Sequence, residues 1–140
     1  MNKSIVILMV LLAGSLNMMV SAQENNYTGG DTLVVVWTSG DFEVAEKMVY
    51  MYVFNAKRAG WFDEVIFIIW GPSAKLLSEN EKLREYLYKM KDEGIILEAC
   101  IACANMYGVA DDLRNMGIDV KGMGSVLSDY LKKGHRVMTY

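Results

Sequence analysis

The only two cysteines of this chain, Cys100 and Cys103, are separated by two residues. They lie where the apolar segment 95–99 meets the amphipathic segment 104–116, a pattern that predicts a strand running into a helix. A thiol at a helix N-terminus ionises more readily, and the thiolate is the form that attacks sulfur. We therefore predict that Cys100 forms a persulfide or a mixed disulfide. Cys103 would resolve this adduct, releasing the cargo and closing a disulfide.

Two other interpretations of the cysteine pair remain open. The pair could serve a thiol-disulfide redox protein, although thioredoxin topology is disfavoured because the cysteines follow the third predicted strand. It could also be an inert disulfide in a binding or assembly module that holds a small ligand or another subunit. Structural zinc takes four ligands, and the chain has one histidine, His135, and no second cysteine pair. We therefore expect neither a metal nor a bound cofactor.

Short apolar segments alternate with longer amphipathic segments from residue 31 onward. Strands are predicted at 32–37, 64–70, 95–99, 118–121 and 136–140. Helices are predicted at 42–59, 78–93, 104–116 and 125–133. The second helix begins with a capping box of Ser78 and Glu81. Each helix is followed by a glycine, a residue that often ends helices with positive φ: Gly60, Gly94, Gly117 and Gly134. Because the first two strands are apolar on both faces, we predict an α/β fold with a mainly parallel sheet in a single domain.

Right-handed crossovers bring every strand-to-helix loop of such a sheet to one edge, at the carboxyl ends of the strands. That edge is expected to carry the two cysteines and several glycine and serine residues of the neighbouring loops: Ser39, Gly40, Gly71, Ser73 and Gly124. Backbone amides of glycine-rich turns and helix N-termini can bind an anion. These five residues are candidates for substrate or anion binding, although each turn can also be an ordinary turn without a ligand.

The N-terminal residues have the pattern of a cleaved signal peptide. Lys3 precedes the apolar segment 5–16, and Val20, Ser21 and Ala22 form a cleavage pattern of small residues. The apolar segment is shorter than the roughly 20 residues of a spanning helix, so we expect no membrane anchor after cleavage. The expected organisation is a signal peptide at 1–22, a flexible leader at 23–30 and an α/β domain at 31–140. The protein would be periplasmic or otherwise exported, where the environment is oxidising.

Charge and apolar composition limit the possible partners. Lys3 is the only charged residue among residues 1–22, so 13 of the 14 basic residues and all 17 acidic residues remain, a net charge of −4. No cluster of lysine and arginine is evident, which argues against nucleic acid as a partner. The segment 48–54 is apolar around more than one helix face, so we expect self-association into a homo-oligomer.

Four segments together resemble a known family. They are 34–41 (VVVWTSGD), 70–74 (WGPSA), 98–104 (EACIACA) and 134–138 (GHRVM). They are similar to the DsrE/DsrF-like family of sulfur-relay proteins, and the resemblance extends over 31–140. It implies a compact three-layer α/β/α sandwich with a five-stranded sheet, usually assembled into homo-oligomers. It also implies that sulfur is carried as a persulfide between partner proteins or small sulfane-sulfur compounds, without a cofactor.

The resemblance assigns roles to individual residues. Cys100 matches the family cysteine, and Gly108 stands eight residues later, as in the family pattern. Cys103 matches a second cysteine that only some members have. Relatives often carry a basic residue just before that glycine, whereas this chain has Tyr107.

Overall fold

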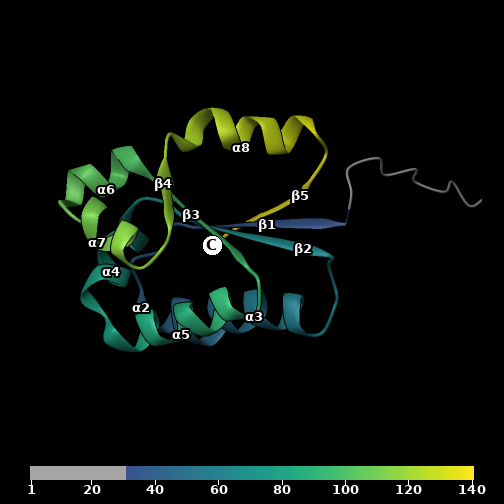
Figure 1. The fold of residues 1–140 in the computed structure, drawn as a ribbon, viewed down its shortest axis with the longest axis horizontal. Helices are drawn as coiled ribbons and strands as arrows, with labels where there is room; N and C mark the ends of the chain where they lie inside the picture. Colours follow the sequence, from purple (N-terminus) through teal and green to yellow (C-terminus); the bar gives the residue numbers. More distant parts are fainter. Residues whose placement is uncertain (1–30) are drawn as a thin grey trace, which may run out of the picture.

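The computed structural model describes residues 31–140, so the predicted signal peptide and leader lie outside the described residues. The elements follow one another as β1 (Thr32–Trp37), α2 (Phe42–Val44), η1 (Ala45–Tyr50), α3 (Met51–Arg58), β2 (Glu64–Ile69), α4 (Pro72–Glu79), α5 (Glu81–Asp92), β3 (Ile96–Cys100), α6 (Ile101–Tyr107), α7 (Ala110–Asn115), β4 (Asp119–Lys121), α8 (Met123–Lys132) and β5 (Arg136–Thr139). The strands form one sheet in the order β4-β3-β2-β1-β5, and all neighbouring pairs are parallel. The predicted α/β fold class is confirmed (Figure 1).

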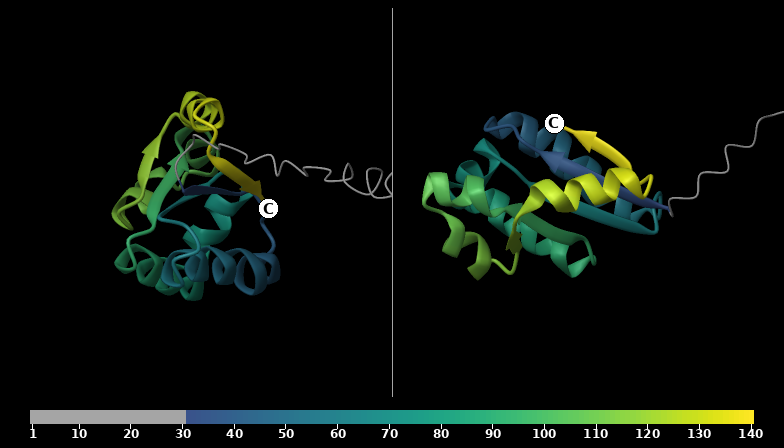
Figure 2. Two further views of the ribbon diagram at one scale, coloured as in Figure 1. Left: turned by 90° about the vertical axis from the view of Figure 1, so that its right-hand side faces the viewer. Right: turned by 90° about the horizontal axis from the view of Figure 1, so that it is seen from above.

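The helices cover the two faces of the sheet unequally. From β1 to β4 each strand is placed beside its predecessor in one direction, and α3 and α5 lie together on one face of the sheet (Figure 1). The last connection returns from β4 to the opposite edge beside β1, so a right-handed crossover places α8 on the other face. Figure 2 shows α8 lying alone on its side of the sheet.

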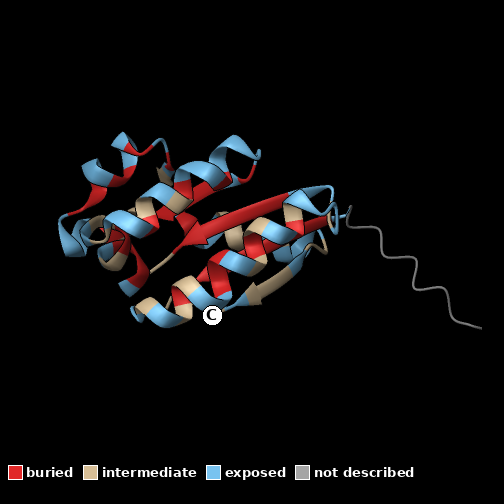
Figure 3. Ribbon diagram, turned by 90° about the horizontal axis from the view of Figure 1, so that it is seen from below, coloured by how far each residue is buried: buried red, intermediate tan, exposed pale blue. Residues whose placement is uncertain are grey.

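The core follows the alternation of side chains along the buried strands. In β1, Leu33, Val35 and Trp37 pack toward α3 and α5, whereas Val34 and Val36 pack toward α8. Figure 3 shows the buried residues of the helices turned toward the sheet and the exposed residues turned outward. Among residues 31–140, none of the helices has the length and apolarity that a membrane crossing requires.

The first predicted helix, 42–59, is continuous but contains a wider turn. Its middle part, η1, is a π-helix between α2 and α3. The wider turn allows the adjacent Val49 and Tyr50 to be buried together. Met48 and Met51 remain about half exposed, at 51% and 52%.

The second predicted helix, 78–93, corresponds to α5, which begins three residues later at Glu81, and the predicted capping box is wrong. The helix α4, at Pro72–Glu79, was not predicted. Asn80 leaves the helical conformation, with φ −115° and ψ 108°, and its side chain accepts a hydrogen bond from the Leu83 amide at 3.0 Å. Asn80 is therefore the cap of α5. The Ser78 hydroxyl instead donates to the Lys75 carbonyl within α4.

The remaining predicted boundaries need smaller corrections. The third helix is divided into α6 and α7 because Gly108 adopts φ +70°, and the fourth begins at Met123 rather than at residue 125. The glycines predicted to end helices all have positive φ, which confirms that prediction: Gly60, Gly94, Gly117 and Gly134. The strand boundaries lie within one residue of their predicted positions.

Candidate functional site

Cys100 occupies the junction that the sequence predicted. It is the last residue of β3 and the N-cap of α6, with extended backbone angles of φ −77° and ψ 113°. Its side chain is buried on the α8 face of the sheet, in a cluster with Ile68 and Met123. β3 lies between β2 and β4, so the loops that leave these two strands flank the thiol.

Cys103 lies one helical turn after Cys100 and is half-buried. Its thiol is hydrogen-bonded to the Cys100 side chain and accepts a hydrogen bond from the backbone amide of Gly71. Burial, followed by the bond to Cys100, raises the pKa of the Cys103 thiol, and the Gly71 amide partly opposes this shift. Cys103 therefore keeps its proton near neutral pH. Both cysteines are free thiols in the structure.

Three of the five predicted binding residues lie at the carboxyl edge of the sheet, two before a helix and one in the first turn of a helix. Gly71 adopts φ +77° at the start of α4 and contacts Cys103 through its amide. Gly40, in the loop after β1, is packed so closely on α4 that an added Cβ would lie 3.1 Å from the Pro72 Cβ. Gly124 is exposed in the first turn of α8, directly after the Met123 that packs on Cys100.

The two predicted serines make local hydrogen bonds. Ser73 is fully buried, and its hydroxyl donates to the Trp37 carbonyl at 2.6 Å and accepts from the Trp70 amide at 3.0 Å. It thereby joins the ends of β1 and β2. The Ser39 hydroxyl accepts a hydrogen bond from the Asp41 amide at 3.1 Å. Binding of an anion or substrate by these five residues stays a prediction.

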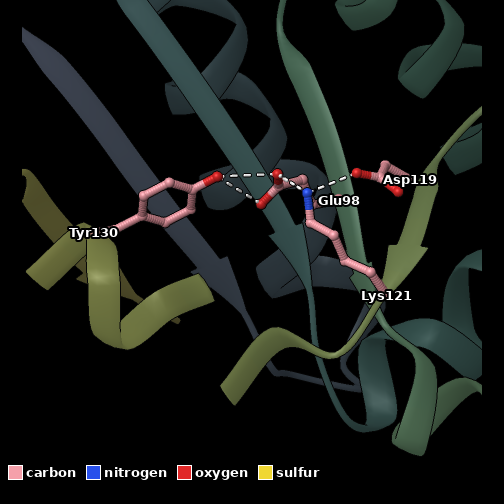
Figure 4. Close-up of polar contacts among 4 residues, drawn as sticks. All are labelled: Glu98, Asp119, Lys121 and Tyr130. Carbon is pink, nitrogen blue, oxygen red and sulfur yellow. Dashed lines mark hydrogen bonds and ion pairs between the residues drawn. The ribbon is translucent and has the colours of Figure 1, made fainter. Parts of the chain in front are cut away.

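A group of charged and polar side chains beside Cys100 was not found from the sequence. Glu98 is buried two residues before Cys100 on β3, so both side chains share the α8 face. Its carboxylate accepts hydrogen bonds from Lys121 Nζ at 2.6 Å and from the Tyr130 hydroxyl at 3.0 and 3.1 Å. Lys121 also donates to Asp119 at 2.6 Å (Figure 4). The group joins β3, β4 and α8.

Lys121 stays positively charged within this group. Hydrogen bonds to Asp119 and then to Glu98 raise the pKa of Lys121 well above its ordinary value. Burial, and then the bond to Glu98, raises the pKa of Tyr130 to about 12. In the sheet, Lys121 is the register partner of Cys100. The Lys121 ammonium thus lies next to the thiol strand, where it is paired with Glu98 and Asp119.

A cavity of about 260 Å³ opens at the same edge of the sheet. Its lining comes from α4, the end of α6 and the loop after β1: Gly40, Pro72, Lys75, Leu76, Glu79 and Tyr107. Pro72 directly follows the Gly71 that contacts Cys103, and Tyr107 follows Cys103 by one helical turn. Neither cysteine is among the residues that line the cavity. Among residues 31–140, no group of three or more His, Cys, Asp and Glu side chains could hold a metal ion.

The fold and the site define a class of small, parallel α/β proteins that carry a thiol pair at the carboxyl edge of the sheet. No protein-family model matches the chain. The solved structure of BT1422, a conserved protein of unknown function from Bacteroides thetaiotaomicron, is similar with a TM-score of 0.77 and 34% identity, covering 83% of this chain and 100% of that chain. The chain belongs to the same family as BT1422.

Two further proteins are similar to this chain. It is 33% identical over 82 residues to the uncharacterized protein MJ0733 of Methanocaldococcus jannaschii, covering 54% of this chain and 65% of that protein. The chain therefore spans slightly less than two thirds of the length of this relative. The crystal structure of YchN from E. coli is similar with a TM-score of 0.59 and 10% identity, covering 79% of this chain and 99% of that chain. At this identity the similarity shows a shared fold alone.

Proposed function

We propose that this protein is an exported sulfur carrier of the DsrE-like type, with Cys100 as the sulfur-bearing residue and Cys103 as the resolving thiol. The observation that supports this proposal is the contact between the two thiols at the start of α6, where Cys103 retains its proton and is hydrogen-bonded to Cys100. A protonated neighbour can stabilise a negatively charged sulfur on Cys100.

The proposed loading step transfers one sulfur atom without an external oxidant. The Cys100 thiolate attacks the outer sulfur of a persulfide donor, RS–SH. The bond between the two donor sulfurs breaks, the bond from Cys100 Sγ to the outer sulfur forms, and RS⁻ leaves with the electron pair and takes up a proton. An acceptor thiolate can reverse these events and remove the sulfur.

The proposed resolving step uses Cys103. Its thiolate attacks Cys100 Sγ, hydrosulfide leaves with the electron pair, and a disulfide joins the two cysteines. A dithiol reductant must then reduce this disulfide before the next loading. Because the pKa of Cys103 is raised, resolution should be slow near neutral pH and become faster at higher pH. This would leave time for transfer to an acceptor.

The surroundings of the pair suit a negatively charged sulfur. The helices α4, α6 and α8 all begin at this edge, and each N-terminus carries about half a positive charge. The Gly71 amide already donates to Cys103. Lys121 lies beside Cys100 in the register of β3 and β4, where its positive charge is paired with the carboxylates of Glu98 and Asp119.

A thiol-disulfide redox protein is the second candidate, because two free thiols in hydrogen-bond contact can form a disulfide directly. The two functions differ in their dependence on each cysteine. A sulfur carrier should lose sulfur transfer to an acceptor thiol far more severely in Cys100→Ser than in Cys103→Ser. A redox protein should lose disulfide exchange equally in both variants.

We also propose that copies of the chain associate through an apolar surface formed by η1, α3 and the loop that follows α3. Met48, Met51 and Trp61 are 51%, 52% and 54% exposed there. They line an apolar cavity of about 320 Å³ together with Tyr140, next to the edge strand β5. Sedimentation should show a dimer or larger assembly that Met51→Lys dissociates, with Lys89→Met on α5 as the control. A monomer at every concentration tested would exclude this interface.

A further inference from the structure

Cys100 and three charged side chains are arranged in a square on one face of the sheet. Glu98 and Cys100 stand two residues apart on β3, and both lie on the face that α8 covers. Their register partners on β4 are Asp119 and Lys121. Neighbouring strands of a sheet are about 4.8 Å apart. The stem of Lys121 is therefore the direct neighbour of Cys100 across the sheet.

The square carries an excess of negative charge. The ammonium of Lys121 donates to Glu98 and to Asp119, at 2.6 Å each, so one positive charge faces two negative charges (Figure 4). Cys100 is only 6% exposed, and an ionised sulfur there would add a third negative charge beside apolar side chains. Burial and like charges both disfavour such an anion. An ionised sulfur on Cys100 therefore requires a cation that can turn toward it.

Lys121 can provide this cation by giving up one of its two partners. Its side chain is 35% exposed, and its flexible four-carbon stem starts opposite Cys100. Asp119 is 61% exposed, so water can solvate its carboxylate, and an exposed ion pair contributes little to stability. Glu98 is only 4% exposed, and it has the Tyr130 hydroxyl as a second donor. The bond to Asp119 is therefore the one that Lys121 can break at the smallest cost.

We propose that Lys121 is the counter-ion of the ionised sulfur on Cys100, and that its ammonium moves from Asp119 to this sulfur when the charge forms. This inference rests on the proposed function, because it assigns a further residue to the same loading step. In that step the bond between the two donor sulfurs breaks and the bond from Cys100 Sγ to the outer sulfur forms. RS⁻ leaves with the electron pair and takes up the proton that the new persulfide loses. Lys121 keeps its own proton throughout and neutralises first the thiolate and then the persulfide.

The test measures the rate of Cys100 alkylation by iodoacetamide as a function of pH. Within residues 31–140, titratable groups face Cys100 and Lys121 from four elements: Glu98 of β3, Asp119 of β4, Tyr130 of α8 and Cys103 of α6. A Cys103→Ser background removes the second thiol. Tyr130, with a pKa of about 12, keeps its proton over the measured range of about pH 6 to 10. The profile then reports the apparent pKa of Cys100.

The variants form a double-mutant cycle of Lys121→Gln, Asp119→Asn and their combination. Two substitutions of the same type at exposed positions are the controls. Lys132→Gln lies at the far end of α8, and Asp92→Asn lies at the end of α5 on the opposite face of the sheet. Both controls should leave the profile unchanged.

Lys121→Gln should raise the apparent pKa of Cys100 by about one unit, which slows alkylation at pH 7 about tenfold. Asp119→Asn should lower the apparent pKa by a similar amount and speed alkylation at pH 7, because the ammonium of Lys121 is released toward the sulfur. In the combined variant, the substitution at Asp119 should have far less effect, because no ammonium is left to release.

Two results would overturn the proposal. Equal effects of Asp119→Asn with and without Lys121 would show that Asp119 acts only through its own charge. An unchanged pKa of Cys100 in Asp119→Asn would show that Lys121 does not move to the sulfur. Because Asp119 is mostly exposed, this variant should fold and the result can be read even where Lys121→Gln destabilises the protein.

Sulfur loading from polysulfide separates this inference from the proposed function, because alkylation requires no sulfur donor. If polysulfide adds no sulfur to the unmodified protein, the sulfur-carrier function is wrong. The cycle of Lys121 and Asp119 then still decides whether Lys121 is the counter-ion of the Cys100 thiolate. If polysulfide loads the unmodified protein and Lys121→Gln at equal rates at pH 7, the counter-ion role is wrong and the sulfur-carrier function stands.

Discussion

The two faces of the sheet differ in composition. The face covered by α3 and α5 contains an aromatic cluster in which Trp37 stacks on Phe67 with ring centroids 5.9 Å apart, and Tyr50 contacts both rings edge-on. The face covered by α8 contains Cys100 and the buried carboxylate of Glu98. This difference indicates that the first face mainly stabilises the fold. The second holds the cysteine for which we propose sulfur chemistry.

The largest expected effect on stability comes from the aromatic face. Phe67→Ala should lower the free energy of unfolding by about 3 to 5 kcal/mol, because it leaves a cavity between Trp37 and Tyr50. Urea denaturation measures this loss. The rate of Cys100 labelling by iodoacetamide should stay unchanged under conditions where the variant is folded. A changed rate would show that the two faces are not separate in their roles.

Glu98→Gln should have a smaller effect on stability and a larger effect on the thiol. Lys121 loses one charged partner but keeps Asp119 and some exposure to water, so the expected loss is about 1 to 3 kcal/mol. Cys100 should react faster with iodoacetamide near neutral pH, because one negative charge near its thiolate is removed. Glu85→Gln on the exposed side of α5 is the matched control. Unchanged labelling in Glu98→Gln would contradict an influence of this group on Cys100.

Tyr130→Phe should have the smallest effect at neutral pH and a distinct effect at alkaline pH. The pKa of Tyr130 is raised to about 12 from an ordinary value of 10, so its neutral form is favoured in the folded protein. The stability linked to this group is fully present below pH 10 and is lost as the pH rises toward 12. The free energy of unfolding should therefore fall less steeply between pH 9 and 12 in Tyr130→Phe than in the unmodified protein, as measured by urea denaturation at each pH. If the free energy of unfolding falls equally steeply in both proteins, Tyr130 does not cause the loss of stability at alkaline pH.

Much of the fold could be predicted because its signals are local. The continuous apolar runs around Val35 and Phe67 indicate buried parallel strands, and the glycines that end helices mark their boundaries. The helix α4 was missed because Gly71 and Pro72, which stand at its start, also indicate a turn. Asn80, the cap of α5, was missed because Ser78, which is also a residue type that caps helices, lies only two residues before it.

The site could be predicted in position but not in its surroundings. Cys100 and Cys103 were recognisable because their spacing and their place at a strand end are sequence properties. Lys121 and Tyr130 reach Glu98 across 23 and 32 residues of chain, and such contacts depend on the strand order. One signal was present in the sequence: Glu98 is a lone charge within an otherwise apolar strand, which requires a partner when that strand is buried.

The most direct test of the sulfur-carrier proposal is the intact mass of the reduced protein before and after incubation with a sulfane-sulfur donor such as polysulfide. We predict a gain of about 32 Da that a reductant removes and that Cys100→Ser abolishes, as expected for a persulfide on that residue. A product about 2 Da lighter than the dithiol, with no sulfur gained from any donor, would mean a plain disulfide and contradict it.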